Sequence, residues 1–256
     1  MFKKKEPKVA VEKVYTYAPT GKLAKILKYL LTASIVLSVL SIAANLWGIS
    51  FINQISSGAS ITQEQGDIID GFAALVAIIA LVVHIVTGIC FLRWFYLLRR
   101  NMSAMKVQFF EGHPLDVVGA FIIPIVNLYQ PLVHAQDIWR ATDSNFPSDR
   151  HWAGAPSSPV IKFWWFFFVC QNIAHQVSGF YASISMKKNV RLVELLNVYT
   201  YSAIAEVLSI VAAVLAIKVV VAMTERQEKF HSLRFENTGQ TSTEQQSALE
   251  PKADAS

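Results

Sequence analysis

Long apolar runs dominate this sequence and limit the folds that are open to it. Four stretches, at 29–52, 72–92, 163–184 and 198–223, are each long and apolar enough to be read as membrane spans, because a spanning helix needs about 20 mostly apolar residues. Charged residues make up 16% of the chain, against roughly 25% in a typical soluble domain. We therefore expect an all-α polytopic membrane protein whose membrane domain covers residues 24–223.

The basic residues predict how the chain is oriented. Residues 1–28 carry eight Lys and two Glu, whereas the loop at 53–70 carries three acidic residues and no Lys or Arg. By the positive-inside rule, the basic arm at 1–23 is cytoplasmic and the loop lies outside. No motif for reading nucleic acid accompanies the basic arm, so we expect it to meet a membrane surface and expect no nucleic-acid partner.

A fifth apolar segment, at 117–135, is interrupted by Pro124, Asn127 and Pro131. Each proline removes a backbone donor, and non-helical backbone at membrane depth survives only when it is covered by protein or faces water. We expect a proline-broken re-entrant or interfacial hairpin between the second and third spanning helices, with a kinked fifth span as the alternative. With Lys218 left out because it lies within an apolar stretch, four spans place 19 Lys and Arg inside and 3 outside, whereas five spans place 15 inside and 7 outside. Charge therefore favours a four-helix transmembrane bundle, with a polar, partly disordered cytoplasmic tail at 224–256 that frays by about residue 238.

Each predicted span carries a stripe of small or polar residues at helical spacing. Such residues let membrane helices approach closely and form hydrogen bonds with one another, so the stripes are expected to face the inside of the bundle. The four stripes are Ser34, Ser38, Ser41 and Asn45; Ala73, Ala77, Ala80, His84 and Gly88; Gln171, His175, Ser178 and Ala182; and Ser202, Glu206, Ser209 and Ala213.

Three ionisable residues of these stripes, His84, His175 and Glu206, are candidates for a functional site. An ionisable side chain inside a membrane is costly and often functional. Together the three could ligate a metal ion, the two histidines could ligate a haem, and Glu206 could serve a proton path. No metal-site motif such as HExxH is present, so the alternative is that all three are hydrogen-bonded bundle residues, and no cofactor is the expectation.

A second candidate is a binding surface formed by the end of the second span and the broken insert. The arginines could instead be anchors that reach the lipid headgroups. This candidate surface consists of Arg93, Trp94, Arg99, Arg100, Asn101, Pro124, Asn127 and Pro131.

The same block carries a family resemblance. The residues concerned are Trp94, Arg99, Arg100 and Asn101, then Phe121, Pro124, Asn127, Leu128 and Pro131, then Ile138-Trp139-Arg140. Over about residues 75–223 the chain resembles a bacterial family of integral membrane proteins, the domain of unknown function numbered 4328. The resemblance implies an integral membrane protein and implies no particular activity, cofactor or site residue.

Taken together, these features favour a multi-pass inner-membrane protein that acts as a non-enzymatic component and binds a partner or a small ligand, with an enzyme active at the membrane surface left open. The chain has no Ser-His-Asp grouping, phosphate loop or nucleotide fingerprint that would indicate catalytic residues. The alternatives are a haem- or metal-binding protein using His84 and His175, and a small transporter or proton path using Glu206. The expected partner is the lipid bilayer, with a protein partner or self-association left open.

Overall fold

A computed structural model describes residues 15–58, 62–110, 112–123, 125–145, 151–185 and 191–249, with side chains described as far as 234. Every regular element in these residues is a helix. Four are long: α1 (Gly21–Ser56), α2 (Gln63–Ala104), α5 (Pro159–Ser185) and α6 (Leu192–Leu249). The short ones lie between α2 and α5: α3 (Asp116–Ile122), η1 (Val126–Leu128), α4 (Gln130–Ala141) and η2 (Trp152–Gly154).

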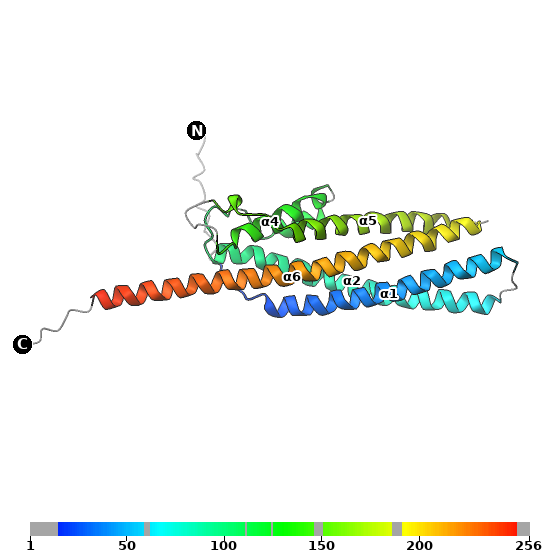
Figure 1. Ribbon diagram of the computed structural model, residues 1–256, viewed down its shortest axis with the longest axis horizontal. Coiled ribbons are helices and arrows are strands. Elements are labelled where there is room, and N and C mark those ends of the chain that lie inside the picture. The colour runs from blue at the N-terminus through cyan, green and yellow to red at the C-terminus, as the bar shows by residue number, and fades with distance from the viewer. Residues whose placement is uncertain are drawn as a thin grey trace, which may run out of the picture.

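The four long helices run side by side (Figure 1). α1 packs against both α2 and α6, and α5 packs against α6, while α3 and α4 lie against α2 and α5. The turn between α1 and α2 lies at the same end of the bundle as the end of α5 and the start of α6. At the opposite end α6 continues well beyond its neighbours (Figure 1).

Three helical segments are long and apolar enough to cross a membrane: α1, α2 and residues Leu192–Arg234 of α6. Their apolar side chains are largely exposed, as expected of surfaces that face lipid; on α2, Leu75, Ile78, Leu81 and Ile89 are all more than half exposed. α5 is not among the three, because polar residues such as Gln171, Asn172 and His175 lower its mean hydropathy. The membrane character of the fold is therefore present, and the fourth predicted span remains a prediction.

Two helices extend further than the sequence indicates. The second apolar stretch stops at residue 92, but α2 continues to Ala104. α6 is helical to Leu249, past the point near residue 238 where fraying was expected. Loss of hydrophobicity marks where a helix leaves an apolar environment, but a polar sequence without proline can continue the same helix.

The insert is broken into short pieces. α3 ends at Ile122, the single turn η1 follows, and α4 begins at Gln130. Pro131 lies in the first turn of α4, a position where the missing N–H costs little because it has no partner in the helix. Pro124 lies outside the described residues.

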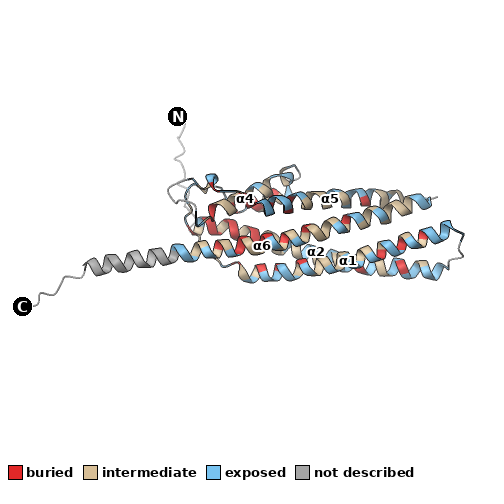
Figure 2. Ribbon diagram, in the orientation of Figure 1, coloured by how far each residue is buried: buried red, intermediate tan, exposed pale blue. Residues whose placement is uncertain are grey.

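The buried core is concentrated at the end of the bundle that holds this insert, where α2, α4, α5 and α6 meet (Figure 2). Aromatic rings fill much of it. Phe91 lies 5.3 Å from Trp94 and 5.7 Å from Trp164 between ring centroids, and Phe121 of α3 meets Phe95 edge-on at 6.0 Å. The indole N–H of Trp165 donates to the carbonyl of Leu128 at 2.9 Å, which fastens η1 to α5.

Candidate functional site

Asn101 lies in the last turn of α2 and is fully buried. Its side chain accepts from the backbone N–H of Ala18 at 3.0 Å and donates to the carbonyl of Ala18 at 2.9 Å. It also donates to Oε1 of Gln227 at 2.8 Å, and Gln227 donates in turn to the carbonyl of Leu98. Asn101 therefore joins three segments far apart in sequence: the approach to α1, the end of α2 and the middle of α6.

Trp94 and Arg99 of α2 are also buried; Trp94 shares a face of the helix with Asn101, whereas Arg99 lies on a different face. The indole N–H of Trp94 donates to Oγ1 of Thr224 on α6 at 3.0 Å. Arg99 is 6% exposed and lies 4.1 Å over the ring of Phe110. Burial lowers the pKa of Arg99, and the carboxylates of Asp116 and Asp137 oppose that change.

Arg99 has ionisable neighbours on α4. Burial raises the pKa of Asp137, although the nearby charge of Arg99 acts in the opposite direction. Burial also lowers the pKa of His134, and the charge of Arg99 adds to that effect. Gly112, with φ of +99°, is needed here because a Cβ would lie 2.7 Å from Nη2 of Arg99 and 2.9 Å from Oδ2 of Asp116.

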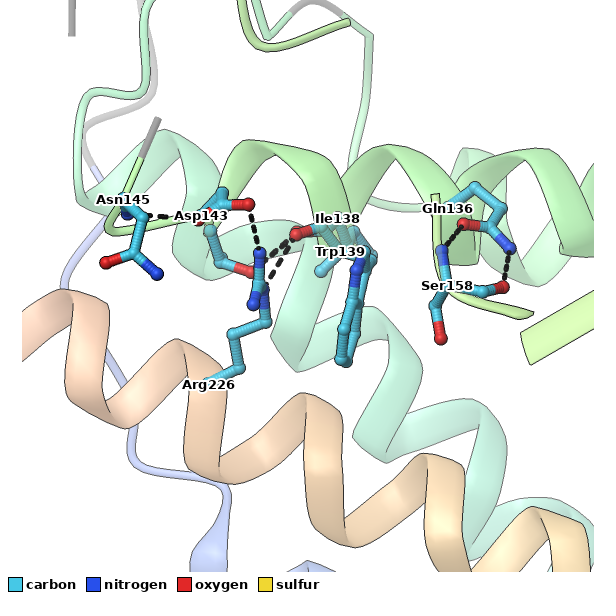
Figure 3. A network of polar contacts seen from close by, with 8 residues as sticks. Gln136, Ile138, Trp139, Asp143, Asn145, Ser158 and Arg226 are labelled. Carbon is cyan, nitrogen blue, oxygen red and sulfur yellow. Dashed lines mark hydrogen bonds and ion pairs between the residues drawn. The ribbon is translucent and has the colours of Figure 1, made fainter. Parts of the chain in front are cut away.

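Polar contacts at two places fasten α4 and the residues that follow it to α6 and to the start of α5 (Figure 3). Nη2 of Arg226 lies 2.9 Å from Oδ2 of Asp143, and its Nε donates to the carbonyl of Trp139 at 3.0 Å. Gln136 is buried and exchanges two hydrogen bonds with the backbone of Ser158, at 2.8 and 2.9 Å. The insert is therefore a fixed part of the bundle.

The predicted binding surface consequently consists of residues with different surroundings. Trp94, Arg99, Asn101 and Pro131 are buried, Asn127 is half-buried, Arg100 is half-buried and donates to the carbonyl of Thr16, and Arg93 is exposed. Sequence reading placed them on one surface because it could not see that α6 covers Trp94 and Asn101, or that the ring of Phe110 lies against Arg99. The contacts of the buried residues Trp94, Arg99 and Asn101 hold helices and loops of the protein together.

Two of the other three candidate residues, His175 and Glu206, line a cavity of about 210 Å³ nearer the opposite end of the bundle. All four long helices contribute to its wall, and all four predicted stripes are represented. The lining consists of Ser41, Ala44, Asn45, Ala73, Val76, Ala77, His175, Tyr199, Ser202 and Glu206.

Hydrogen bonds between helices surround this cavity. Oγ of Ser41 on α1 donates to Oε1 of Glu206 on α6 at 3.3 Å. Nε2 of His175 lies 2.9 Å from Oγ of Ser209, and the hydroxyls of Ser178 and Ser202 are 2.6 Å apart. The expectation that the stripes face inward and bond across helices is met at these positions.

His84 does not join the other two members of the proposed metal site. It is exposed on α2 and does not line the cavity, whereas His175 and Glu206 both do. Within the described part of the chain, no three His, Cys, Asp or Glu side chains lie close enough together to hold a metal ion. Similar depth along separate helices did not predict proximity, because the rotation of each helix decides which side chains meet.

Sequence reading missed Tyr199, Thr224, Arg226 and Gln227. Tyr199 lines the cavity and packs against Gly48, where a Cβ would come within 2.5 Å of the ring. The others follow the last apolar stretch and were assigned to the tail. A helical projection that continued past residue 223 would have found Thr224 and Gln227, because they are three residues apart on one face.

The fold is that of an all-helical protein with membrane-spanning character. A family model described as Domain of unknown function (DUF4328) matches residues 58–225. The chain therefore belongs to this family. The matched region includes α2, the insert, α5 and the cavity-lining part of α6, but not α1. No curated protein and no solved structure matches the chain.

Proposed function

We propose that the protein is a multi-pass inner-membrane protein in which all four long helices span the bilayer and both termini are cytoplasmic. α5 has 27 residues and is therefore about 40 Å long, which exceeds a hydrocarbon core of about 30 Å. Its side chains Phe163, Phe166 and Phe180 are each at least 59% exposed, as lipid-facing residues would be. The 19-to-3 distribution of Lys and Arg supports this orientation.

In this proposal the insert enters the cytoplasmic side of the bilayer as a re-entrant or interfacial hairpin. Ile122, Ile125 and Leu128 are 69%, 77% and 61% exposed, and they lie together around the break between α3 and η1. Exposed isoleucine and leucine side chains at one tip are favourable in lipid and unfavourable in water.

Labelling of introduced cysteines tests this topology. Ser232, exposed on α6 beyond the apolar region, would be replaced by Cys in a variant whose Cys90 and Cys170 are Ser. A membrane-impermeant thiol reagent should label Ser232→Cys only after the cells are opened. Labelling in intact cells would contradict the four-span orientation.

We further propose that the protein is a non-enzymatic component that binds a small ligand within the membrane. The observation that carries this proposal is the cavity of about 210 Å³ on which polar side chains from α1, α5 and α6 converge. Concave sites that combine apolar walls with a few polar groups are the usual places for small ligands. Transport of such a ligand or of protons is the second candidate, because the Glu206 carboxyl lines the same cavity.

Chemical access to the cavity tests the ligand-binding proposal. In the background lacking Cys90 and Cys170, Ser202→Cys should react with the small neutral reagent methyl methanethiosulfonate. Leu81→Cys, at a 60% exposed position that faces lipid in this arrangement, is the control and should react much more slowly. Equally slow reaction at the two positions would overturn the cavity as a ligand site.

A further inference from the structure

We infer that the cavity selects a small organic cation, a primary ammonium with a short apolar chain. This inference rests on the proposed ligand-binding function and adds the chemical class of the ligand. Three features of the cavity wall support it: the charge of the lining residues, the hydrogen-bond acceptors for which no donor is described, and the apolar side chains beside them.

The cavity wall contains an acidic residue, Glu206, and no Lys or Arg. Among the described residues, Glu206 receives one hydrogen bond, from the Ser41 hydroxyl, and forms no ion pair. The wall's imidazole, on His175, is engaged through Nε2 with Ser209. A carboxylate in an apolar setting is stabilised strongly by a cation that also donates hydrogen bonds.

The polar atoms that remain available include acceptors on two helices. Nδ2 of Asn45 donates to the carbonyl of Ser41 at 2.8 Å, and no partner is described for Oδ1 of Asn45. Oε1 of Glu206 accepts from Ser41, and no donor to Oε2 is described. An ammonium group has three donors and no acceptor, so it complements this set.

The rest of the wall fits a short apolar chain. Ala44, Ala73, Val76 and Ala77 form its apolar side, on α1 and α2. Tyr199 also lines the cavity, and its ring offers a π-face that attracts cations. The cavity volume of about 210 Å³ limits the ligand to a small molecule.

A protection assay on the full-length protein tests this inference. Three probes with the same four-carbon chain, n-butylammonium, 1-butanol and butyrate, would compete with methyl methanethiosulfonate for Ser202→Cys in the background lacking Cys90 and Cys170. We expect n-butylammonium to protect at concentrations about 10- to 100-fold lower than 1-butanol, the difference that a charge-assisted hydrogen bond supplies. Butyrate should protect least.

Two matched variants test whether the Glu206 carboxylate causes the stronger protection by n-butylammonium. Glu206→Gln keeps the size of the side chain and should remove most of the advantage of n-butylammonium over 1-butanol. Glu225→Gln makes the same change at an exposed position of the same helix and should leave the advantage unchanged. Protection by n-butylammonium and by 1-butanol is compared within the same variant. A change in the reactivity of the introduced thiol therefore affects both values equally. If Glu206→Gln does not fold, Asn45→Ala removes the second acceptor and should reduce the advantage while keeping the carboxylate.

The outcomes separate the two proposals. Equal protection by n-butylammonium and 1-butanol, or an ammonium advantage that survives in Glu206→Gln, would overturn the cationic ligand and leave a neutral-ligand cavity. An unreactive Ser202→Cys would overturn the proposed ligand site itself, and the ligand class with it.

Discussion

Replacing Asn101 with alanine should destabilise the protein substantially, although this side chain touches neither the cavity nor the solvent. The variant loses two hydrogen bonds to the backbone of Ala18 and one to Gln227. Each bond contributes about 0.5–1.5 kcal/mol, and the buried Oε1 of Gln227, once unpaired, costs about 1–3 kcal/mol. With partial relaxation, we expect the free energy of unfolding to fall by about 2–5 kcal/mol.

The measurement is reversible unfolding of the purified protein in mixed detergent micelles. Asn172→Ala is the matched control, because Asn172 is exposed and its side chain donates to the carbonyl of Phe168 in its own helix. The control should change stability by less than about 0.5 kcal/mol. A loss of under about 1 kcal/mol for Asn101→Ala would refute the conclusion that this residue joins α1, α2 and α6.

Three further changes have defined outcomes in the same unfolding assay. Gly48→Ala should cost about 1–3 kcal/mol, since its Cβ would lie 2.5 Å from the ring of Tyr199. Asp143→Asn should cost about 1–3 kcal/mol, because it removes the ion-pair partner of Arg226 at a position only partly open to solvent. Burial, reinforced by a nearby carboxylate, raises the pKa of Tyr17 from 10.0 to about 12, so the folded state keeps a proton that the unfolded state loses. Stability should therefore fall as pH rises between 10 and 12, and Tyr17→Phe should lessen that fall while changing little at pH 7.

Each of these changes has its own control. Gly88→Ala places a Cβ in open space and should be neutral or stabilising by up to about 1 kcal/mol, so equal effects at the two glycines would contradict the close contact at Gly48. Glu194→Gln removes the partner of Arg191, whose side chain is 76% exposed, and should cost less than Asp143→Asn. An unchanged alkaline fall in Tyr17→Phe would show that other groups cause it.

The sequence determined the features that depend on composition and spacing along one helix. Apolar runs of sufficient length predicted the membrane-spanning character of α1, α2 and α6, because a helix in lipid must be apolar over a fixed length. The proline-containing insert is interrupted, as expected. The stripes at Ser41, His175 and Glu206 predicted inward faces, because helical periodicity alone fixes which residues share a side.

Only the tertiary structure decided which stripes meet, and at what depth. His84 and His175 were equally good ligands in the sequence, yet only His175 reaches the cavity. Asn101 looked like a surface residue, yet α6 covers it with Gln227, a residue 126 positions away. The reason is physical: periodicity specifies a face relative to its own helix axis, whereas proximity depends on the rotation and offset between helices, which packing across the whole bundle sets.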